Sequence, residues 1–173
     1  MLIYLDTMIV QYIIKYQEYI FGEISGYSGE CPVTEPKLKR ELNALRELIF
    51  LDQLGDWVYA CPPHLCDELN AGKPTAEQQE SYQILMKTWK ESSWTDAFPL
   101  DESEVSRVEA SLKILRLKPA DQRHLAEAIV LNASWFLTND KKIINKCKRK
   151  QLPLSVARPS ECLNEISVGL FLR

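Results

Sequence analysis

The chain has 173 residues, of which 46% are hydrophobic and 26% are charged. A single domain of about 100–200 residues has this length, so we expect residues 1–173 to fold as one domain. The balance of apolar and charged residues excludes an intrinsically disordered chain. Lysine and arginine total 21 against 24 aspartates and glutamates, and the resulting net charge of −3 excludes a surface that is basic throughout, as duplex DNA binding would need.

The amino-terminal segment has no feature of export or membrane insertion. Asp6 and Lys15 interrupt its apolar run, and it has neither a preceding basic segment nor a small-residue cleavage site. No window of about 18 uncharged apolar residues occurs, so no membrane span is expected. The five cysteines are odd in number and include no CxxC pair, which favours reduced thiols, several of them buried, over a zinc ribbon. We therefore expect a cytoplasmic protein without a membrane partner.

Hydrophobic spacing divides the first half of the chain into strands and helices. A short apolar run that ends at Asp6 predicts a buried parallel strand. Three of the six glycines lie in residues 22–36, which predicts a loop inserted between two helices. The elements expected here are a strand at 2–5, a helix through Ile20, a helix over 38–49 ended by Gly55, a strand at 57–63, and a helix from Pro63 to near Gly72.

The second half of the chain continues the same alternation. Its expected elements are a helix capped by Thr75, a weaker strand at 94–100, a helix capped by Asp101 and Ser103, a helix begun by Pro119 and Asp121, a strand at 135–138, a short basic helix from Lys141, and a strand at 154–157. Residues 166–173 are apolar enough for an edge strand or a contact with a second copy, although ordinary core packing is favoured. Strands that alternate with helices indicate the α/β class with a mainly parallel sheet.

Acidic residues fall at or just beyond the ends of the predicted strands. Asp6 closes the first strand, Glu68 lies within two helical turns of the second, and Asp140 follows the strand at 135–138. Asp121 joins them if its helix begins at the same edge of the sheet. Two carboxylates about 5 Å apart repel by roughly 3 kcal/mol at an effective dielectric constant of about 20, so such a cluster needs a cation. Carboxylate oxygens are the ligands that Mg²⁺ or Mn²⁺ prefers, and such a metal generates hydroxide from bound water.

Four segments of the chain together resemble a known family. They read LIYLDTMIV at residues 2–10, VYACPPHLCDEL at 58–69, ADQRHLAEAI at 120–129 and WFLTND at 135–140. The residue types within these segments, and the order of the segments along the chain, are similar to those of the PIN-domain ribonucleases, in particular the VapC-like toxins of toxin–antitoxin pairs. The resemblance implies a three-layer α/β/α PIN-like fold with a mainly parallel central sheet. It also implies RNA hydrolysis with Mg²⁺ or Mn²⁺ and no covalent intermediate.

The resemblance also implies a set of site residues. The predicted catalytic and metal-binding residues are Asp6, Glu68, Asp121 and Asp140, with Thr7, Thr138 and Asn139 in supporting positions. Asp67 is the alternative to Glu68, and the leucine that follows Glu68 favours the glutamate. The glycine-containing loop at 22–36 has no counterpart in the family pattern.

A basic segment follows the last of these acids. Residues 141–150 read KKIINKCKRK, with six basic residues in ten and no acidic one. Phosphates would be attracted to such a patch beside the acidic site, and Lys141, Lys142 and Lys146 are the predicted RNA-binding residues. An amphipathic surface helix with solvated lysines, whose Ile143, Ile144 and Cys147 face inward, is the alternative.

Histidines leave open a second kind of metal site. His64 and Glu68 are four residues apart on one predicted helix, and Asp121 and His124 are three apart on another, so each pair lies on one helix face. Zinc favours histidine-containing sites. The all-carboxylate site is preferred because the resembling family uses carboxylates.

We therefore predict a Mg²⁺- or Mn²⁺-dependent endoribonuclease. The resemblance adds an antitoxin protein and a second copy of the chain as expected partners. The alternative is a catalytically silent PIN-like module that binds RNA or a protein, in which the acids hold no organised metal.

Overall fold

In the part of the chain that the structure describes, the central sheet consists of four short strands that are all parallel. A computed structural model describes residues 1–22, 29–52, 57–60, 63–91 and 100–171. Within them the strands are β1 (Leu2–Leu5), β2 (Val58–Ala60), β3 (Trp135–Leu137) and β4 (Ser155–Ala157), in the spatial order β2-β1-β3-β4. Ile3 of β1 is aligned with Tyr59 of β2 on one side and with Trp135 of β3 on the other. The predicted parallel sheet is confirmed.

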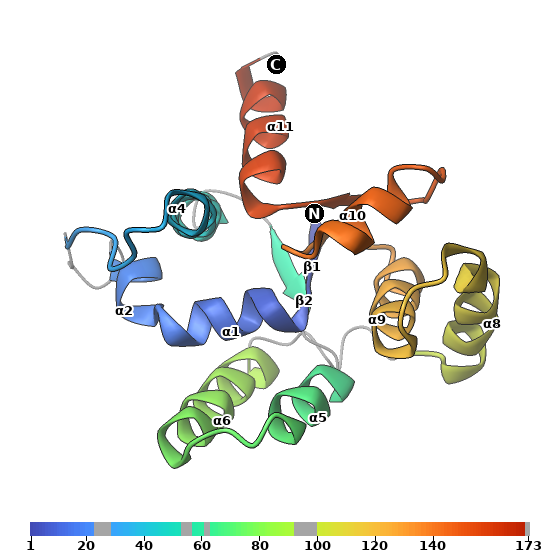
Figure 1. Cartoon of the computed structure of the whole chain (residues 1–173), viewed down its shortest axis with the longest axis horizontal. Coiled ribbons are helices and arrows are strands. Elements are labelled where there is room, and N and C mark those ends of the chain that lie inside the picture. The colour runs from blue at the N-terminus through green and yellow to red at the C-terminus, as the bar shows by residue number, and fades with distance from the viewer. Residues whose placement is uncertain (23–28, 53–56, 61–62, 92–99, 172–173) are drawn as a thin grey trace.

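Helices cover both faces of this sheet. They are α1 (Thr7–Lys15), α2 (Gln17–Ile20), α4 (Pro36–Asp52), α5 (Pro63–Ala71), α6 (Ala76–Glu91), α8 (Glu102–Leu112), α9 (Pro119–Val130), α10 (Lys141–Cys147) and α11 (Pro159–Phe171), with a short 3₁₀ turn η1 (Lys113–Leu115) after α8. Figure 1 shows α1, α2 and α4 on one side of the strands and α8 and α9 on the other. The fold is therefore a three-layer α/β/α arrangement, as predicted.

Alternation along the strands divides the hydrophobic core in two. Ile3, Leu5 and Leu137 point toward the layer that contains α1, α4 and α11. Tyr4 and Phe136 point toward the layer of α8, α9 and α10. Both faces of β1 and β3 are thus buried, which explains why these strands read as unbroken apolar runs in the sequence.

The helix starts follow the predicted caps. The Asp101 carboxylate accepts hydrogen bonds from the N–H groups of Ser103 at 2.9 Å and Glu104 at 3.3 Å, at the start of α8. At α6, Gln78 N–H donates to Thr75 Oγ1 at 3.2 Å while Thr75 N–H donates to Gln78 Oε1 at 2.9 Å, a reciprocal capping box.

Three predicted segments are described only in part or fold differently from the prediction. Residues 29–35 of the predicted loop contain no helix or strand, and 23–28 lie outside the described residues. Of the predicted strand at 94–100, all but the last residue lies outside them as well. An edge strand at 166–173 is wrong, because α11 continues through Phe171. Cys162, Leu163 and Ile166 of α11 pack on the first core. These apolar positions recur at helical spacing, so the segment buries them by forming a helix.

Burial also accounts for the described thiols. Cys147 and Cys162 are buried, and burial raises the pKa of the Cys147 thiol to about 11 and that of Cys162 to about 12. Both behave as small apolar residues, as the sequence predicts. Of the helices that the structure describes, none combines the length and apolarity needed to cross a bilayer.

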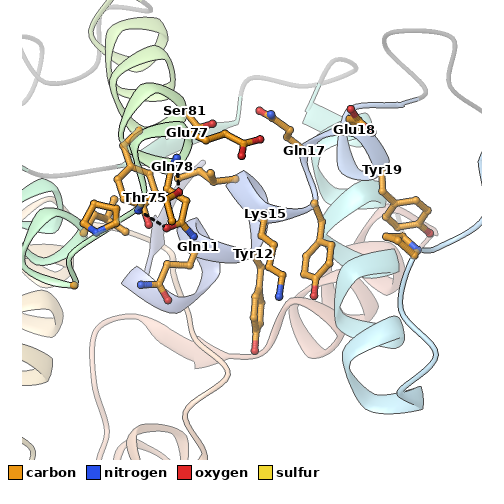
Figure 2. A pocket seen from close by; sticks show the side chains of 17 residues that line it. Gln11, Tyr12, Lys15, Gln17, Glu18, Tyr19, Thr75, Glu77, Gln78 and Ser81 are labelled. Atoms are coloured by element: carbon orange, nitrogen blue, oxygen red, sulfur yellow. Dashed lines mark hydrogen bonds between the residues drawn. The ribbon is translucent and has the colours of Figure 1, made fainter.

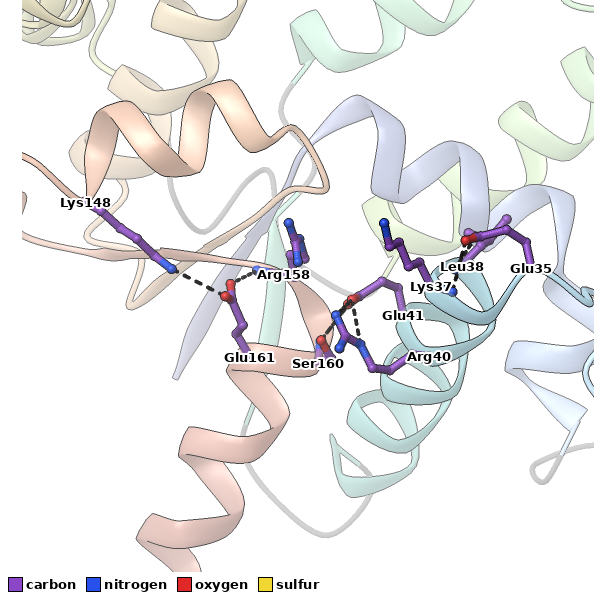
Figure 3. A network of polar contacts seen from close by, with 9 residues as sticks. All are labelled: Glu35, Lys37, Leu38, Arg40, Glu41, Lys148, Arg158, Ser160 and Glu161. Carbon is purple, nitrogen blue, oxygen red and sulfur yellow. Dashed lines mark hydrogen bonds and ion pairs between the residues drawn. The ribbon is translucent and has the colours of Figure 1, made fainter.

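A buried glutamate fastens α11 to α4. Glu41 is 5% exposed, and its carboxylate accepts hydrogen bonds from Ser160 N–H at 3.0 Å and Ser160 Oγ at 2.9 Å (Figure 3). At the start of α11, the Glu161 carboxylate accepts from the N–H of Arg158, the residue before the helix, at 3.1 Å. Glu41 thus satisfies an N–H group in the first turn of α11 that the helix leaves without an internal partner.

We expect Glu41→Ala to lower the free energy of unfolding by about 2 kcal/mol, because it leaves the half-buried donors of Ser160 without this acceptor. Urea denaturation followed by circular dichroism measures this change. Glu47→Ala on the exposed side of the same helix is the matched control and should change stability by less than about 0.5 kcal/mol. Equal effects of the two variants would contradict a capping role for Glu41.

Candidate functional site

The candidate site lies where the connections of the sheet diverge. In the sheet, β2 lies on one side of the central pair β1 and β3, and β4 lies on the other side. The chain after β1 therefore leads to one edge of the sheet, and the chain after β3 leads to the opposite edge. In open parallel sheets this divergence opens a crevice beyond the carboxyl ends of the two strands, and ligands bind there. Asp6 directly follows β1, and residues 138–140 follow β3. The Asp6 N–H donates to the Leu137 carbonyl at 3.0 Å, which joins the two strand ends.

Asp6 is held in an unusual way for a residue that begins a helix. It is the N-cap residue of α1, but its side chain makes no capping hydrogen bond. Its Oδ2 instead accepts a hydrogen bond of 2.5 Å from Thr138 Oγ1, and the residue is 8% exposed. Burial raises the pKa of the Asp6 carboxyl above its ordinary value, and the hydrogen bond from Thr138 offsets this in part. A buried carboxylate is thus kept at the carboxyl end of a central strand.

Asp121 and Asp140 lie at the starts of α9 and α10. Asp140 caps α10, where its Oδ1 accepts from Lys142 N–H at 2.6 Å. Asp121 lies in the first turn of α9 and accepts from the Lys118 N–H. Burial raises the pKa of Asp121, and the Asp140 carboxylate raises it further; Asp121 in turn raises the pKa of Asp6. Burial is the main cause of the two raised pKa values, and like-charge repulsion links Asp6 to Asp121 and Asp121 to Asp140.

Asn139 adds a second oxygen at this strand end. Its Oδ1 is buried and finds no hydrogen-bond partner among the described residues. Neighbouring Thr138 is fully engaged, since its Oγ1 donates to Asp6 and accepts from Asp140 N–H at 3.0 Å. A buried acceptor without a donor costs free energy, which is typical of a position that a ligand or a cation completes.

Glu68 belongs to a different set of contacts. Its Oε2 accepts from Thr7 Oγ1 at 2.6 Å and lies 2.8 Å from His124 Nε2. The side chain is 29% exposed, so it lies at the surface of the site. Glu68 and Thr7 are thus brought together as a pair, and His124 joins them from α9.

A buried polar network behind His124 was not predicted from the sequence. His124 Nδ1 lies 2.9 Å from the Tyr4 hydroxyl, which donates to Glu127 Oε2 at 2.8 Å. Arg123 completes the network, with Nε 2.6 Å from Glu127 Oε1 and Nη2 2.7 Å from Glu102. The signal in the sequence is Tyr4, the one hydroxyl-bearing residue in the otherwise aliphatic run at residues 2–5.

The predicted RNA-binding lysines differ in their surroundings. Lys141 and Lys142 are exposed at the start of α10, next to Asp140. The ammonium group of Lys146 donates to the Arg116 carbonyl, which gives it a structural role at the end of η1. Ile143, Ile144 and Cys147 are buried, so α10 is the amphipathic helix that the alternative interpretation described.

The donor set fits a hard divalent cation in its chemistry. The three aspartates and Asn139 offer only oxygen atoms, and burial, which raises the pKa values of Asp6 and Asp121, makes their ionised forms costly without a cation. Within the described parts of the chain, however, no three His, Cys, Asp or Glu side chains are grouped closely enough to hold a metal ion. This holds for a zinc site with His124 as well as for the carboxylates, and the side chain of His64 lies outside the description. To bind a cation, the aspartate oxygens would have to contact the metal as well as the donors whose hydrogen bonds they now accept.

A groove lies between α1, α2 and α6. It encloses about 850 Å³ and is lined by tyrosine and amide side chains, among them Tyr12, Gln11 and Gln78 (Figure 2). Lys15 contributes a positive charge, while Glu18 and Glu77 contribute negative ones. None of the four predicted acids lines this groove, so it is a separate feature of the surface.

Comparison of the chain with protein-family models, with curated proteins and with solved structures finds no match.

Proposed function

We propose that the protein is a Mg²⁺- or Mn²⁺-dependent endoribonuclease. The observation that carries this proposal is the position of three acids at the divergence of the sheet: buried Asp6 directly after β1, Asp140 at the start of α10 after β3, and Asp121 in the first turn of α9. Such a group of buried or half-buried like charges lowers stability unless a cation joins it, and a protein keeps strained charges where they serve function. RNA as the substrate follows from the resemblance of four segments to PIN-domain ribonucleases.

Asp6, Asp121 and Asp140 would hold the cation, with Asn139 Oδ1 as an added neutral donor. When bound, the metal would polarise a phosphoryl oxygen and lower the pKa of a coordinated water. Thr138 keeps the Asp6 carboxylate in one orientation through its 2.5 Å hydrogen bond. Lys141 and Lys142 would contact the substrate phosphates, whereas the structure gives Lys146 a contact within the protein.

The direct test is cleavage of an end-labelled single-stranded RNA pool by the purified chain in Mg²⁺, Mn²⁺ or EDTA. We expect internal cuts with metal, none with EDTA, and weaker cleavage at higher salt because phosphate contacts are screened. A matched DNA pool measures the preference for RNA. Absence of cleavage with either metal, on RNA that the protein retains, would contradict the proposal.

A second candidate is a catalytically silent module that binds RNA or a protein. It is favoured by the grouping of the described side chains, in which no three potential ligands close on a metal position. The groove of Figure 2 offers tyrosine and amide groups to a partner. Retention of RNA that EDTA does not alter, without product, would identify this function. The antitoxin partner and the homodimer stay predictions of the resemblance.

A further inference from the structure

We propose that His124 is a positioning residue that fixes the Glu68 carboxylate at the metal site, and that Tyr4 and Glu127 orient His124 for this task. The inference rests on the proposed function, and it gives a structural reason for the placement of Glu68, which the resemblance already predicts as a metal ligand. It concerns the network from Glu127 to Glu68, which the proposed reaction does not otherwise use.

The geometry places His124 between two partners. It lies one turn after Asp121 on α9 and is 2% exposed. On one edge of the ring, Nε2 is 2.8 Å from Glu68 Oε2 and 3.2 Å from Thr7 Oγ1. On the other edge, Nδ1 is 2.9 Å from the Tyr4 hydroxyl. The imidazole therefore connects the buried interior to a carboxylate on the surface of the site.

The donors and acceptors fix which way the ring faces. A tyrosine hydroxyl has one proton, and that of Tyr4 goes to Glu127 Oε2 at 2.8 Å. The Tyr4 oxygen therefore accepts, and His124 Nδ1–H is the donor to it. The Thr7 hydroxyl gives its proton to Glu68, so both oxygens that face Nε2 act as acceptors, and Nε2–H donates to them. In this arrangement the ring carries a proton on each nitrogen. At metal sites, residues behind the metal ligands commonly orient those ligands through hydrogen bonds. Here Glu127 would orient His124 through Tyr4, and His124 would orient Glu68.

The cost of the network argues that it does more than fill space. Tyr4 is fully buried, and His124 and Glu127 are 2% and 1% exposed. Apolar side chains of similar volume would fill this position without desolvating polar groups. The polar series ends at Glu68, whose side chain is 29% exposed and whose Oε2 accepts a hydrogen bond from Thr7, the residue after Asp6. The effect of the network is thus to hold one accessible carboxylate, that of Glu68, in place.

Two substitutions separate positioning from packing. His124→Gln carries an amide nitrogen near the place of Nε2 and keeps a donor toward Glu68. His124→Asn carries its amide near the place of Nδ1 and keeps only the Tyr4 side. Tyr4→Phe is a third, milder variant, because the ring remains stacked on Phe136, 5.3 Å between centroids, while the hydroxyl is lost.

The experiment is Mn²⁺ binding to the full chain, measured by isothermal titration calorimetry, with a thermal melt and the RNA cleavage assay for each variant. We expect His124→Asn to weaken Mn²⁺ binding by about 10- to 100-fold, and His124→Gln to stay within about threefold of wild type. Tyr4→Phe should fall between them, with a folded melt in each case.

Two results would overturn the inference in different ways. If wild type binds Mn²⁺ and cuts RNA, but the Asn and Gln variants match each other, His124 has no positioning role and the proposed function stands. If wild type neither binds Mn²⁺ nor cuts RNA, the proposed function fails, and the role of His124 in it fails too.

Discussion

Asp6→Asn is expected to reduce metal-dependent RNA cleavage by a factor on the order of 100 to 1000, the usual effect of removing one preorganised charge from a reaction site. The same change should leave stability unaltered or raise it by about 1 kcal/mol. Burial raises the pKa of this carboxyl, so its ionised form costs folding free energy at neutral pH, and that cost disappears as the pH falls through the raised pKa. Asparagine keeps the shape and can still accept the hydrogen bond from Thr138.

Asp101→Asn provides a matched control for the same chemical change. Asp101 is exposed at the start of α8, and asparagine is as good an N-cap residue as aspartate, so neither activity nor stability should change. Cleavage rates in Mn²⁺ and thermal melts of both variants are the measurements. An Asp6→Asn protein with wild-type cleavage, free of contaminating nuclease, would contradict the proposed function. One that loses activity by unfolding would contradict the expected cost of the charge.

The fold could be predicted where the signal is local. The strand at residues 2–5 is apolar at every position because both of its faces are buried, with Ile3 in one core and Tyr4 in the other. The start of α8 was predictable because Asp101 caps it with its own side chain. The order β2-β1-β3-β4 was not, since it depends on how long connections cross the sheet.

The same distinction between local and long-range signals applies to the candidate site. The positions of Asp6 and Asp140 could be predicted because Asp6 directly follows β1, Asp140 lies three residues after the end of β3, and parallel strands end at one edge of the sheet. The link from Tyr4 to His124 spans 120 positions and depends on how α9 packs on β1, for which the sequence has no local pattern. Lys146 shows the reverse case, in which a basic residue in a basic segment reaches a backbone carbonyl of the protein itself.

Arg123→Met is expected to lower the free energy of unfolding by about 3 kcal/mol, because it leaves the Glu127 carboxylate without the guanidinium that neutralises it. Glu127 is 1% exposed, and its Oε1 lies 2.6 Å from Arg123 Nε. Arg123 also joins α9 to α8, since its Nη2 donates to both carboxylate oxygens of Glu102 at 2.7 Å. Removal of one partner of a buried ion pair costs far more than the pair itself contributes. Urea denaturation gives the change directly.

Arg107→Met on α8 is the control, because it removes an ion pair of similar helical spacing in water. Arg107 and Glu104 are 2.9 Å apart with side chains 77% and 46% exposed, so we expect a loss below about 0.5 kcal/mol. Adding Glu127→Met to Arg123→Met should recover most of the loss, since no uncompensated charge is then buried; the part that persists, about 1 kcal/mol, is the hydrogen bond that Tyr4 loses. If Arg123→Met costs no more than Arg107→Met, Glu127 does not depend on Arg123. The charge that holds Tyr4, and through it His124, would then have to be balanced elsewhere in the network.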